Sequence, residues 1–203
     1  MKKGILIGIM LLIFAGNLLA NDALRLKDTL GQPGMLWEWD HNNKYWSGYI
    51  ASSTEPSWTV IAAGPSAKLG KWFTIFYGGL KIDQSDPKLK INGAVLETFH
   101  KISLCKDQIG DVTLLRFDAF LTLSREGKDK SNLAFWAHVL ERLGPHYAGG
   151  QIMLSKDSNA SSWSLGPRLE YFFNKNVKVV GVLGVNIKSP HQKSCLVDVW
   201  AMF

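Results

Sequence analysis

The last nine residues of the chain are Cys195-Leu196-Val197-Asp198-Val199-Trp200-Ala201-Met202-Phe203. Counting back from Phe203, every second residue is apolar, and the one charge of the stretch, Asp198, belongs to the alternate set. A period of two residues predicts a β-strand with one apolar face and one mixed face. We therefore expect the chain to end in a strand whose two faces meet different environments.

This strand resembles the closing strand of Gram-negative outer-membrane β-barrels, which ends in an aromatic residue, usually Phe, with apolar residues at every second position before it. The matching residues are Val197, Val199, Ala201 and Phe203. The resemblance implies an antiparallel, up-and-down transmembrane β-barrel in the bacterial outer membrane. It also implies that these four residues are an assembly signal for the barrel-assembly machinery, and that outer-membrane lipid and lipopolysaccharide surround the protein.

The N-terminus has the layout of a secretory signal peptide. Lys2 and Lys3 are followed by an apolar run from Ile5 to Phe14, and the small residue Ala20 marks a cleavage site. The apolar core is short for a membrane-spanning helix, which needs about 20 residues. We expect residues 1–20 to be removed, although retention as an anchor is the alternative.

Composition agrees with a single domain of membrane strands. Cleavage leaves 183 of the 203 residues and lowers the formal charge from +6 to +4, because it removes Lys2 and Lys3. This mild, unclustered excess argues against nucleic acid as a partner. Hydrophobic residues make up 46% of the chain, yet no later stretch approaches 18 unbroken apolar residues. Strands with one lipid-facing side reconcile these facts.

Residues 44–203 are predicted to form the barrel, with turn signals between strands. Residues 21–43 are expected to be an N-terminal leader, a short amphipathic surface helix or a plug, with a possible short strand at 35–39 that would need a second N-terminal strand as its partner. We expect about ten strands, eight and twelve being alternatives. The predicted spans are 44–52, 57–67, 71–82, 90–104, 112–124, 132–142, 146–155, 161–173, 177–189 and 194–203.

The connections indicate the orientation of the barrel. Asn174-Lys175-Asn176, Leu143-Gly144-Pro145 and Lys68-Leu69-Gly70 are short, whereas most of the alternate connections are longer and more polar. Bacterial barrels have short periplasmic turns and longer external loops. The sequence therefore predicts that these three turns, and the longer connection from Cys105 to Asp111, face the periplasm.

The alternation also separates an inner from an outer face. In 161–173, Leu165 and Leu169 share one side, whereas Arg168 and Glu170 share the other. A charge that faces lipid near the midplane costs about 2–4 kcal/mol, so the charged side is predicted to face inward. The same reasoning places ten residues in a lumen charge network: Glu97, Lys101, Arg116, Asp118, His138, Arg142, Arg168, Glu170, Lys178 and Asp198.

Five positive and four negative side chains in a narrow lumen are best explained as paired, since buried charges need partners. A proton relay or a ligand pocket is the sharper alternative. The other inner residues are bulky or apolar: Phe120, Trp136, Val180, Val182, Trp200 and Met202. We therefore expect a filled lumen that conducts no ions.

No catalytic, cofactor-binding or metal-binding residues are predicted. The five histidines show no metal-ligand spacing, and His100 and Ser103 fall on opposite faces of one strand, which spoils a nucleophile–base pair. Cys105 and Cys195 are expected near opposite barrel ends, too far apart for a disulfide.

The leading functional hypothesis is a non-enzymatic outer-membrane barrel with a structural role or a surface-interaction role through its outer loops. The alternatives are a small pore, a lipid A-modifying enzyme and a soluble periplasmic barrel that binds lipid.

Overall fold

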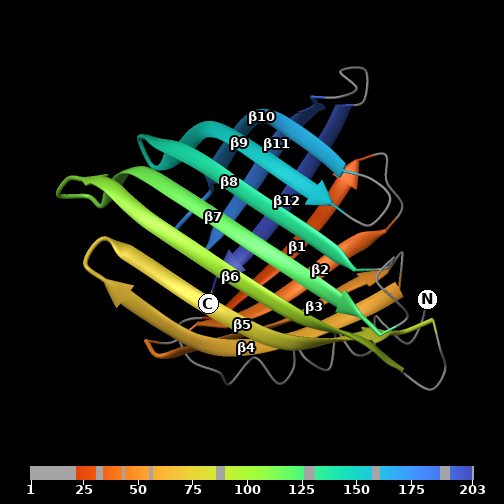
Figure 1. The fold of residues 1–203 in the computed structure, drawn as a ribbon. Coiled ribbons are helices and arrows are strands. Elements are labelled where there is room, and N and C mark those ends of the chain that lie inside the picture. The colour runs from red at the N-terminus through yellow and green to blue at the C-terminus, as the bar shows by residue number, and fades with distance from the viewer. Residues whose placement is uncertain are drawn as a thin grey trace.

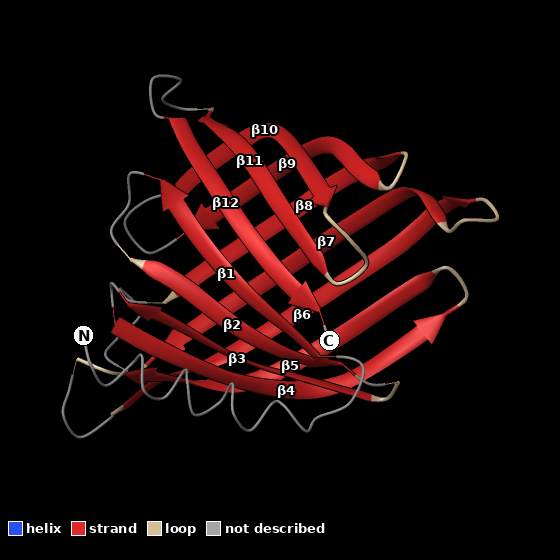
Figure 2. Ribbon diagram, turned by 180° about the vertical axis from the view of Figure 1, so that it is seen from behind, coloured by secondary structure: helices blue, strands red, loops and turns tan. Residues whose placement is uncertain are grey.

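A computed structural model describes residues 22–30, 34–42, 44–54, 57–85, 90–125, 131–156, 161–187 and 193–202. Within these residues, twelve antiparallel strands form one closed barrel in which each strand pairs with its neighbours in sequence and β1 pairs with β12 (Figures 1 and 2). The strands are β1 Asp22–Leu30, β2 Met35–Asn42, β3 Trp46–Thr54, β4 Ser57–Leu69, β5 Trp72–Asp83, β6 Ile91–Lys106, β7 Asp111–Ser124, β8 Asn132–Leu143, β9 His146–Lys156, β10 Ser161–Phe172, β11 Val177–Asn186 and β12 Lys193–Met202.

The predicted closed, antiparallel all-β barrel is confirmed, but the strand number is twelve rather than ten. The additional strands are β1 and β2, which occupy the segment expected to be a leader, a helix or a plug. The possible strand at 35–39 does form, as part of β2, and β1 is the N-terminal partner that it requires. The ten predicted spans correspond to β3 through β12. The signal peptide predicted for residues 1–20 lies outside the described residues.

The barrel closes between the first and the last strand. Leu24 lies opposite Ala201, Leu26 opposite Val199 and Arg25 opposite Trp200. The alternating patterns of β1 and β12 therefore run in phase, because apolar residues meet on one face and larger polar or mixed residues meet on the other. A closed sheet has no free edge strand, which removes the main route to edge-to-edge association.

Most of the short turns gather at one end of the barrel, at the left in Figure 1, and the connection from Thr54 to Ser57 between β3 and β4 is the short one at the other end. The turns at the left join β2 to β3, β4 to β5, β6 to β7, β8 to β9 and β10 to β11. Gly70 and Gly144 adopt φ values of 60° and 62° in two of these turns, a left-handed conformation that glycine tolerates without steric cost. By the rule that short turns face the periplasm, we expect this end to be the periplasmic end.

The strands show the expected division into two faces. In β4, Val60, Ala62 and Ser66 are buried, whereas Ile61 and Ala67 are exposed. Large apolar side chains are also exposed on the outer surface of the other strands, for example Leu96 at 52% and Leu183 at 57%. An apolar exterior around a charged interior is the pattern of a barrel that spans a membrane.

None of the described residues forms a helix that is long and apolar enough to cross a membrane. Cys105 and Cys195 are free, in agreement with the prediction that they do not form a disulfide.

Candidate functional site: the charged lumen

The barrel encloses an open cavity of about 720 Å³. Its lining reaches from Phe73 and Lys101 in the half near the turns to Gly34, Trp58 and Asn132 near the opposite end. This differs from the expectation that bulky side chains fill the lumen, because Phe120, Trp136 and Trp200 line a cavity instead of filling the space. The physical reason is the strand number: barrel diameter grows with the number of strands, and twelve strands enclose more space than the ten expected.

A cluster of three cations around one carboxylate forms part of the wall. Glu170 on β10 is completely buried, and Arg116 Nη1 and Arg168 Nη2 lie 2.8 and 2.9 Å from its Oε1. Lys178 Nζ lies 3.4 Å from Oε2 of the same carboxylate. Arg168 also donates to Gln151 Oε1 at 2.7 Å. One carboxylate against three cations leaves this wall with a net positive charge.

A second ion-paired group joins the first strands to the last. Arg25 on β1 lies between Asp198 on β12, at 2.8 Å from Nη2, and Glu38 on β2, at 3.3 Å from Nη1. The guanidinium also lies 4.7 Å from the ring centroid of Trp200. Lys27 follows two residues later on the same face and lies 6.0 Å from the Trp136 ring. Both contacts are in the range of cation–π attraction.

Carboxylates gather in another part of the wall. The Tyr49 hydroxyl donates to Glu97 Oε2 at 2.5 Å, and Tyr49 packs edge-on against Tyr77 with ring centroids 5.1 Å apart. Asp40 and Asp118 each have one buried oxygen without a hydrogen-bond partner. These acids lie on β2, β6 and β7. Acidic and basic groups are thus partly segregated around the lumen.

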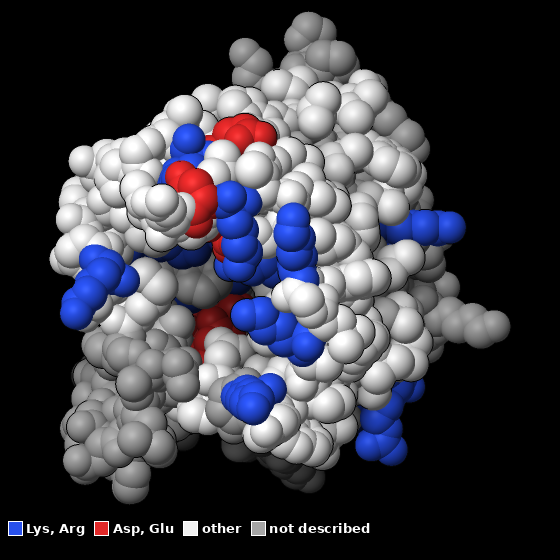
Figure 3. Space-filling view, turned by 90° about the vertical axis from the view of Figure 1, so that its left-hand side faces the viewer, with Lys and Arg blue, Asp and Glu red and all other residues white. Residues whose placement is uncertain are grey.

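Further charges lie at the turn end. Lys101 Nζ is 2.9 Å from Asp111 Oδ2, and Arg142 pairs with Asp107 in the turn between β6 and β7. The hydrogen bond from Arg142, supported by the backbone N–H groups of Ile109 and Gly110, lowers the pKa of the Asp107 carboxyl. Figure 3 looks onto this end, where Lys and Arg side chains surround a central hollow and acidic side chains lie within and beside it.

The strand register places all ten predicted network residues on the inner face or at its end. Seven of them line the cavity: Glu97, Lys101, Arg116, Asp118, His138, Arg168 and Lys178. Glu170 and Asp198 lie behind the lining with no exposed surface, and Arg142 lies at the turn end. His138 is half-buried, and both of its ring nitrogens lack a hydrogen-bond partner.

Four charged lumen residues are absent from the sequence prediction: Arg25, Lys27, Glu38 and Asp40. They lie on β1 and β2, which were expected outside the barrel. The signal that could have found them is the alternation Arg25, Lys27 against Leu24, Leu26 and Glu38, Asp40 against Trp37, Trp39.

Positive and negative side chains of the central lumen are equal in number, but those that line the cavity are mostly positive. Among the residues that the structure describes, the cavity is lined by six cations, Arg25, Lys27, Lys101, Arg116, Arg168 and Lys178, and by four carboxylates, Glu38, Asp40, Glu97 and Asp118. The other two carboxylates, Glu170 and Asp198, are completely buried. A solute in the cavity therefore contacts more positive than negative groups.

The predicted assembly signal belongs to the opposite face of β12. Val199 is 37% exposed, and Val197, Val199 and Ala201 alternate with the lumen residues Asp198 and Trp200. Phe203 lies outside the described residues. The role of these residues in assembly stays a prediction.

Among the described residues, no group of three or more His, Cys, Asp or Glu side chains is arranged to hold a metal ion. Ser103 is buried, whereas His100 contacts Trp72 and Thr74 on the outer face.

No model of a protein family matches the sequence, and no curated protein does either. The structure, in contrast, is similar to those of solved porins. A KdgM porin superposes with a TM-score of 0.63 at 12% identity, covering 89% of this chain and 99% of that one. A KdgM porin in complex with disordered oligogalacturonate gives a TM-score of 0.59 at 11% identity, covering 90% and 99%. The NanC porin gives a TM-score of 0.59 at 9% identity, covering 90% and 98%. At these identities the likeness concerns the fold, which is that of outer-membrane porins.

Proposed function

We propose that the protein is a small pore of the bacterial outer membrane that admits small anionic solutes. The observation that carries this proposal is the open cavity of about 720 Å³, whose surface presents six cations and four carboxylates. The pore was an alternative in the sequence analysis. It replaces the filled barrel as the leading hypothesis because the barrel encloses a cavity and its structural neighbours are porins.

The arrangement favours anions for an electrostatic reason. Charged walls of low dielectric constant focus the field in a narrow passage and raise the local concentration of counter-ions. Rings of Arg and Lys side chains are the usual means by which pores select anions. Here the two carboxylates without solvent contact, Glu170 and Asp198, hold neighbouring cations in place while remaining shielded from a passing solute.

Two further points support the proposal. The structural neighbour in complex with oligogalacturonate holds an anionic ligand, in agreement with a passage for anions. The apolar outer surface, the short turns at one end and the predicted signal peptide support insertion into the outer membrane.

Planar-bilayer recordings of the purified protein test this function. With a salt gradient across the bilayer, we expect single-channel steps and a reversal potential on the anion-selective side. Lys27→Glu should move the reversal potential toward cation selectivity, because Lys27 lines the cavity. The matched control is Lys156→Glu on the exposed end of β9, which should leave the reversal potential unchanged. Absence of steps, or cation selectivity of the unmodified protein, would overturn the proposal.

A further inference from the structure

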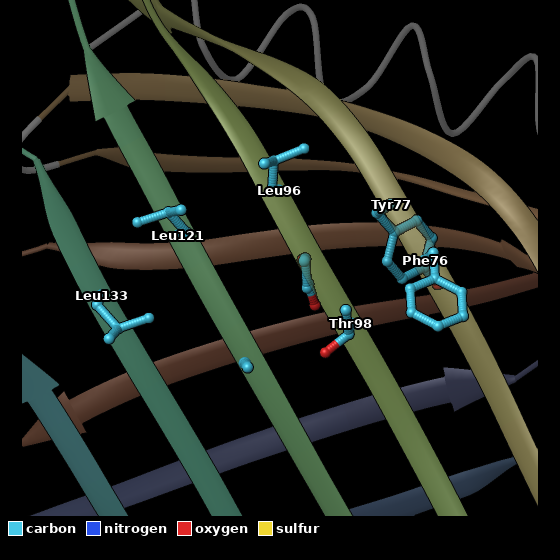
Figure 4. A pocket seen from close by; sticks show the side chains of 8 residues that line it. Phe76, Tyr77, Leu96, Thr98, Leu121 and Leu133 are labelled. Atoms are coloured by element: carbon cyan, nitrogen blue, oxygen red, sulfur yellow. The ribbon is translucent and has the colours of Figure 1, made fainter.

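The outer surface carries a groove of about 370 Å³ across β5 to β8 (Figure 4). Its walls are large apolar side chains and its floor contains small ones. The outward residues that line it are Phe76, Leu96, Thr98, Ala119, Leu121 and Leu133. The lining is almost entirely apolar, so an occupant must be apolar too.

The groove arises from the sizes of neighbouring side chains in register. Thr98 lies opposite Ala119, and Gly78 lies opposite Leu96. A side chain added at Gly78 would meet open space. Large residues flank this low region, with Phe76 51% and Leu133 41% exposed. The result is a channel between ridges on a surface that faces the hydrocarbon of the membrane.

On β7 and β8 the groove lies nearer the loop end than the turn end of the barrel, whereas Phe76 on β5 lies nearer the turn end. On β7, which runs from Asp111 to Ser124, Leu121 is three residues from the loop end and ten from the turn end. At about 3.3 Å per residue, these separations are roughly 10 and 33 Å along the strand. With the turns in the periplasm, an acyl chain that enters the groove from the loop end along β7 and β8 lies in the outer leaflet.

Basic residues lie above the groove at the ends of the same two strands. The backbone N–H of Arg125 donates to the Asn92 carbonyl at 2.8 Å, so the ends of β6 and β7 remain joined there. Arg125 and Lys90 are exposed. Arg125 follows Leu121 and Leu123 at even spacing, which continues the outward face of the strand. An apolar groove below two cations is complementary to a lipid with acyl chains and a phosphate.

We infer that this surface is a binding site for lipopolysaccharide, with one acyl chain in the groove and a lipid A phosphate against Arg125 and Lys90. The inference concerns the outer surface and is independent of the pore function. It names a position for the lipopolysaccharide contact that the sequence analysis expected only in general terms.

Native mass spectrometry of the full chain in detergent, titrated with lipid A, tests the site. We expect one tightly bound lipid A, and about fivefold weaker binding for lipid A without phosphates, as for the loss of a surface charge contact. Ala119→Leu fills the floor of the groove and should weaken binding about tenfold. Arg125→Gln should remove most of the difference between phosphorylated and dephosphorylated lipid.

The matched controls are Ala67→Leu and Lys156→Gln, the same kinds of substitution at exposed positions outside the groove. Both should bind lipid A as the unmodified protein does, and the migration of unboiled samples on SDS gels shows that each variant is folded. Equal affinity for phosphatidylglycerol, unchanged binding in both Ala119→Leu and Arg125→Gln, or a dimer that shields the groove from lipid would overturn the inference. If Ala119→Leu does not fold, the comparison of Arg125→Gln with Lys156→Gln decides alone.

Discussion

Arg25 on the first strand holds Asp198 on the last strand, with Nη2 and Oδ2 2.8 Å apart across the seam that closes the barrel. Asp198 has no exposed surface, so its charge depends on this partner. Backbone hydrogen bonds join β1 to β12 along the seam, and the ion pair adds a side-chain contact between the same two strands. It also continues to β2, because Arg25 contacts Glu38.

Asp198→Asn should therefore destabilise the closed barrel. We expect the free energy of unfolding to fall by roughly 1.5–3 kcal/mol, the value of a hydrogen bond to a charged group, because Arg25 keeps Glu38 as a partner. Urea unfolding in lipid vesicles, followed by tryptophan fluorescence, measures the change. Glu141→Gln at the exposed end of β8 is the control. A similar, small change in both variants would mean that the seam pair does not contribute.

Glu170→Gln should cost more. Glu170 is the shared partner of Arg116, Arg168 and Lys178, and its neutralisation leaves three cations without a carboxylate in a buried place. Breaking such a group typically costs roughly 3–5 kcal/mol. The same unfolding measurement applies, with Glu141→Gln on the exposed periplasmic end of β8 as control. A loss below that of Asp198→Asn would contradict the central position given to Glu170.

The two faces of β12 should respond differently to polar residues. Val199→Arg puts a charge against lipid, at a cost of about 2–4 kcal/mol near the midplane. Leu196 lines the cavity, so Leu196→Thr should be tolerated better. The yield of folded protein in the membrane fraction compares the two. Equal yields would be incompatible with the orientation of β12.

Most of the barrel could be predicted from the sequence because period-two alternation is a local property. Leu165 and Leu169 against Arg168 and Glu170 reveal two environments without knowledge of any other strand. Since one face must meet hydrocarbon, the side of each charge follows. This is why the register places every predicted network residue inside or at the end of the lumen.

The strand number and the open lumen could not be predicted in the same way. Residues 22–30 contain Arg25, Lys27 and Asp28 among leucines, a pattern that also fits an amphipathic helix. Their strand conformation depends on pairing with β12, which lies at the other end of the chain. Without β1 and β2, the predicted barrel had ten strands and a smaller diameter. In a barrel of that diameter the same Trp and Phe side chains would fill the lumen. The partners of Glu170 likewise come from three strands, and no local pattern relates them.

The pairing of Asp107 predicts an acid effect at the periplasmic turn. Because its pKa is lowered in the folded protein from the ordinary 3.8, its contribution to the turn is fully present above that value and is lost as the pH falls through the lowered pKa. The protection of the N–H groups of Ile109 and Gly110 against hydrogen exchange, measured relative to an unfolded reference at the same pH, should fall in this acid range, because both groups donate to Asp107. Asp107→Asn should remove the pH dependence of this protection. Protection that does not change with pH in the unmodified protein would contradict the role of the carboxylate.

The final prediction separates the size of the passage from its charge. Trp136 lines the cavity and its ring lies 6.0 Å from Lys27 Nζ, so the two side chains shape the same part of the lumen. Trp136→Ala removes an indole from the wall of this part of the lumen without changing any charge. It should raise the single-channel conductance and leave the sign of the reversal potential unchanged.

Lys27→Gln should instead change the ion selectivity more than the conductance, because it removes one lumen cation while changing the side-chain volume little. It should shift the reversal potential toward zero and change the conductance less than Trp136→Ala does. Trp163→Ala is the control for the loss of an indole, because Trp163 is 38% exposed and alternates with the lumen face of β10. If Trp136→Ala and Trp163→Ala give the same conductance as the unmodified protein, ions do not pass the part of the lumen that Trp136 and Lys27 share.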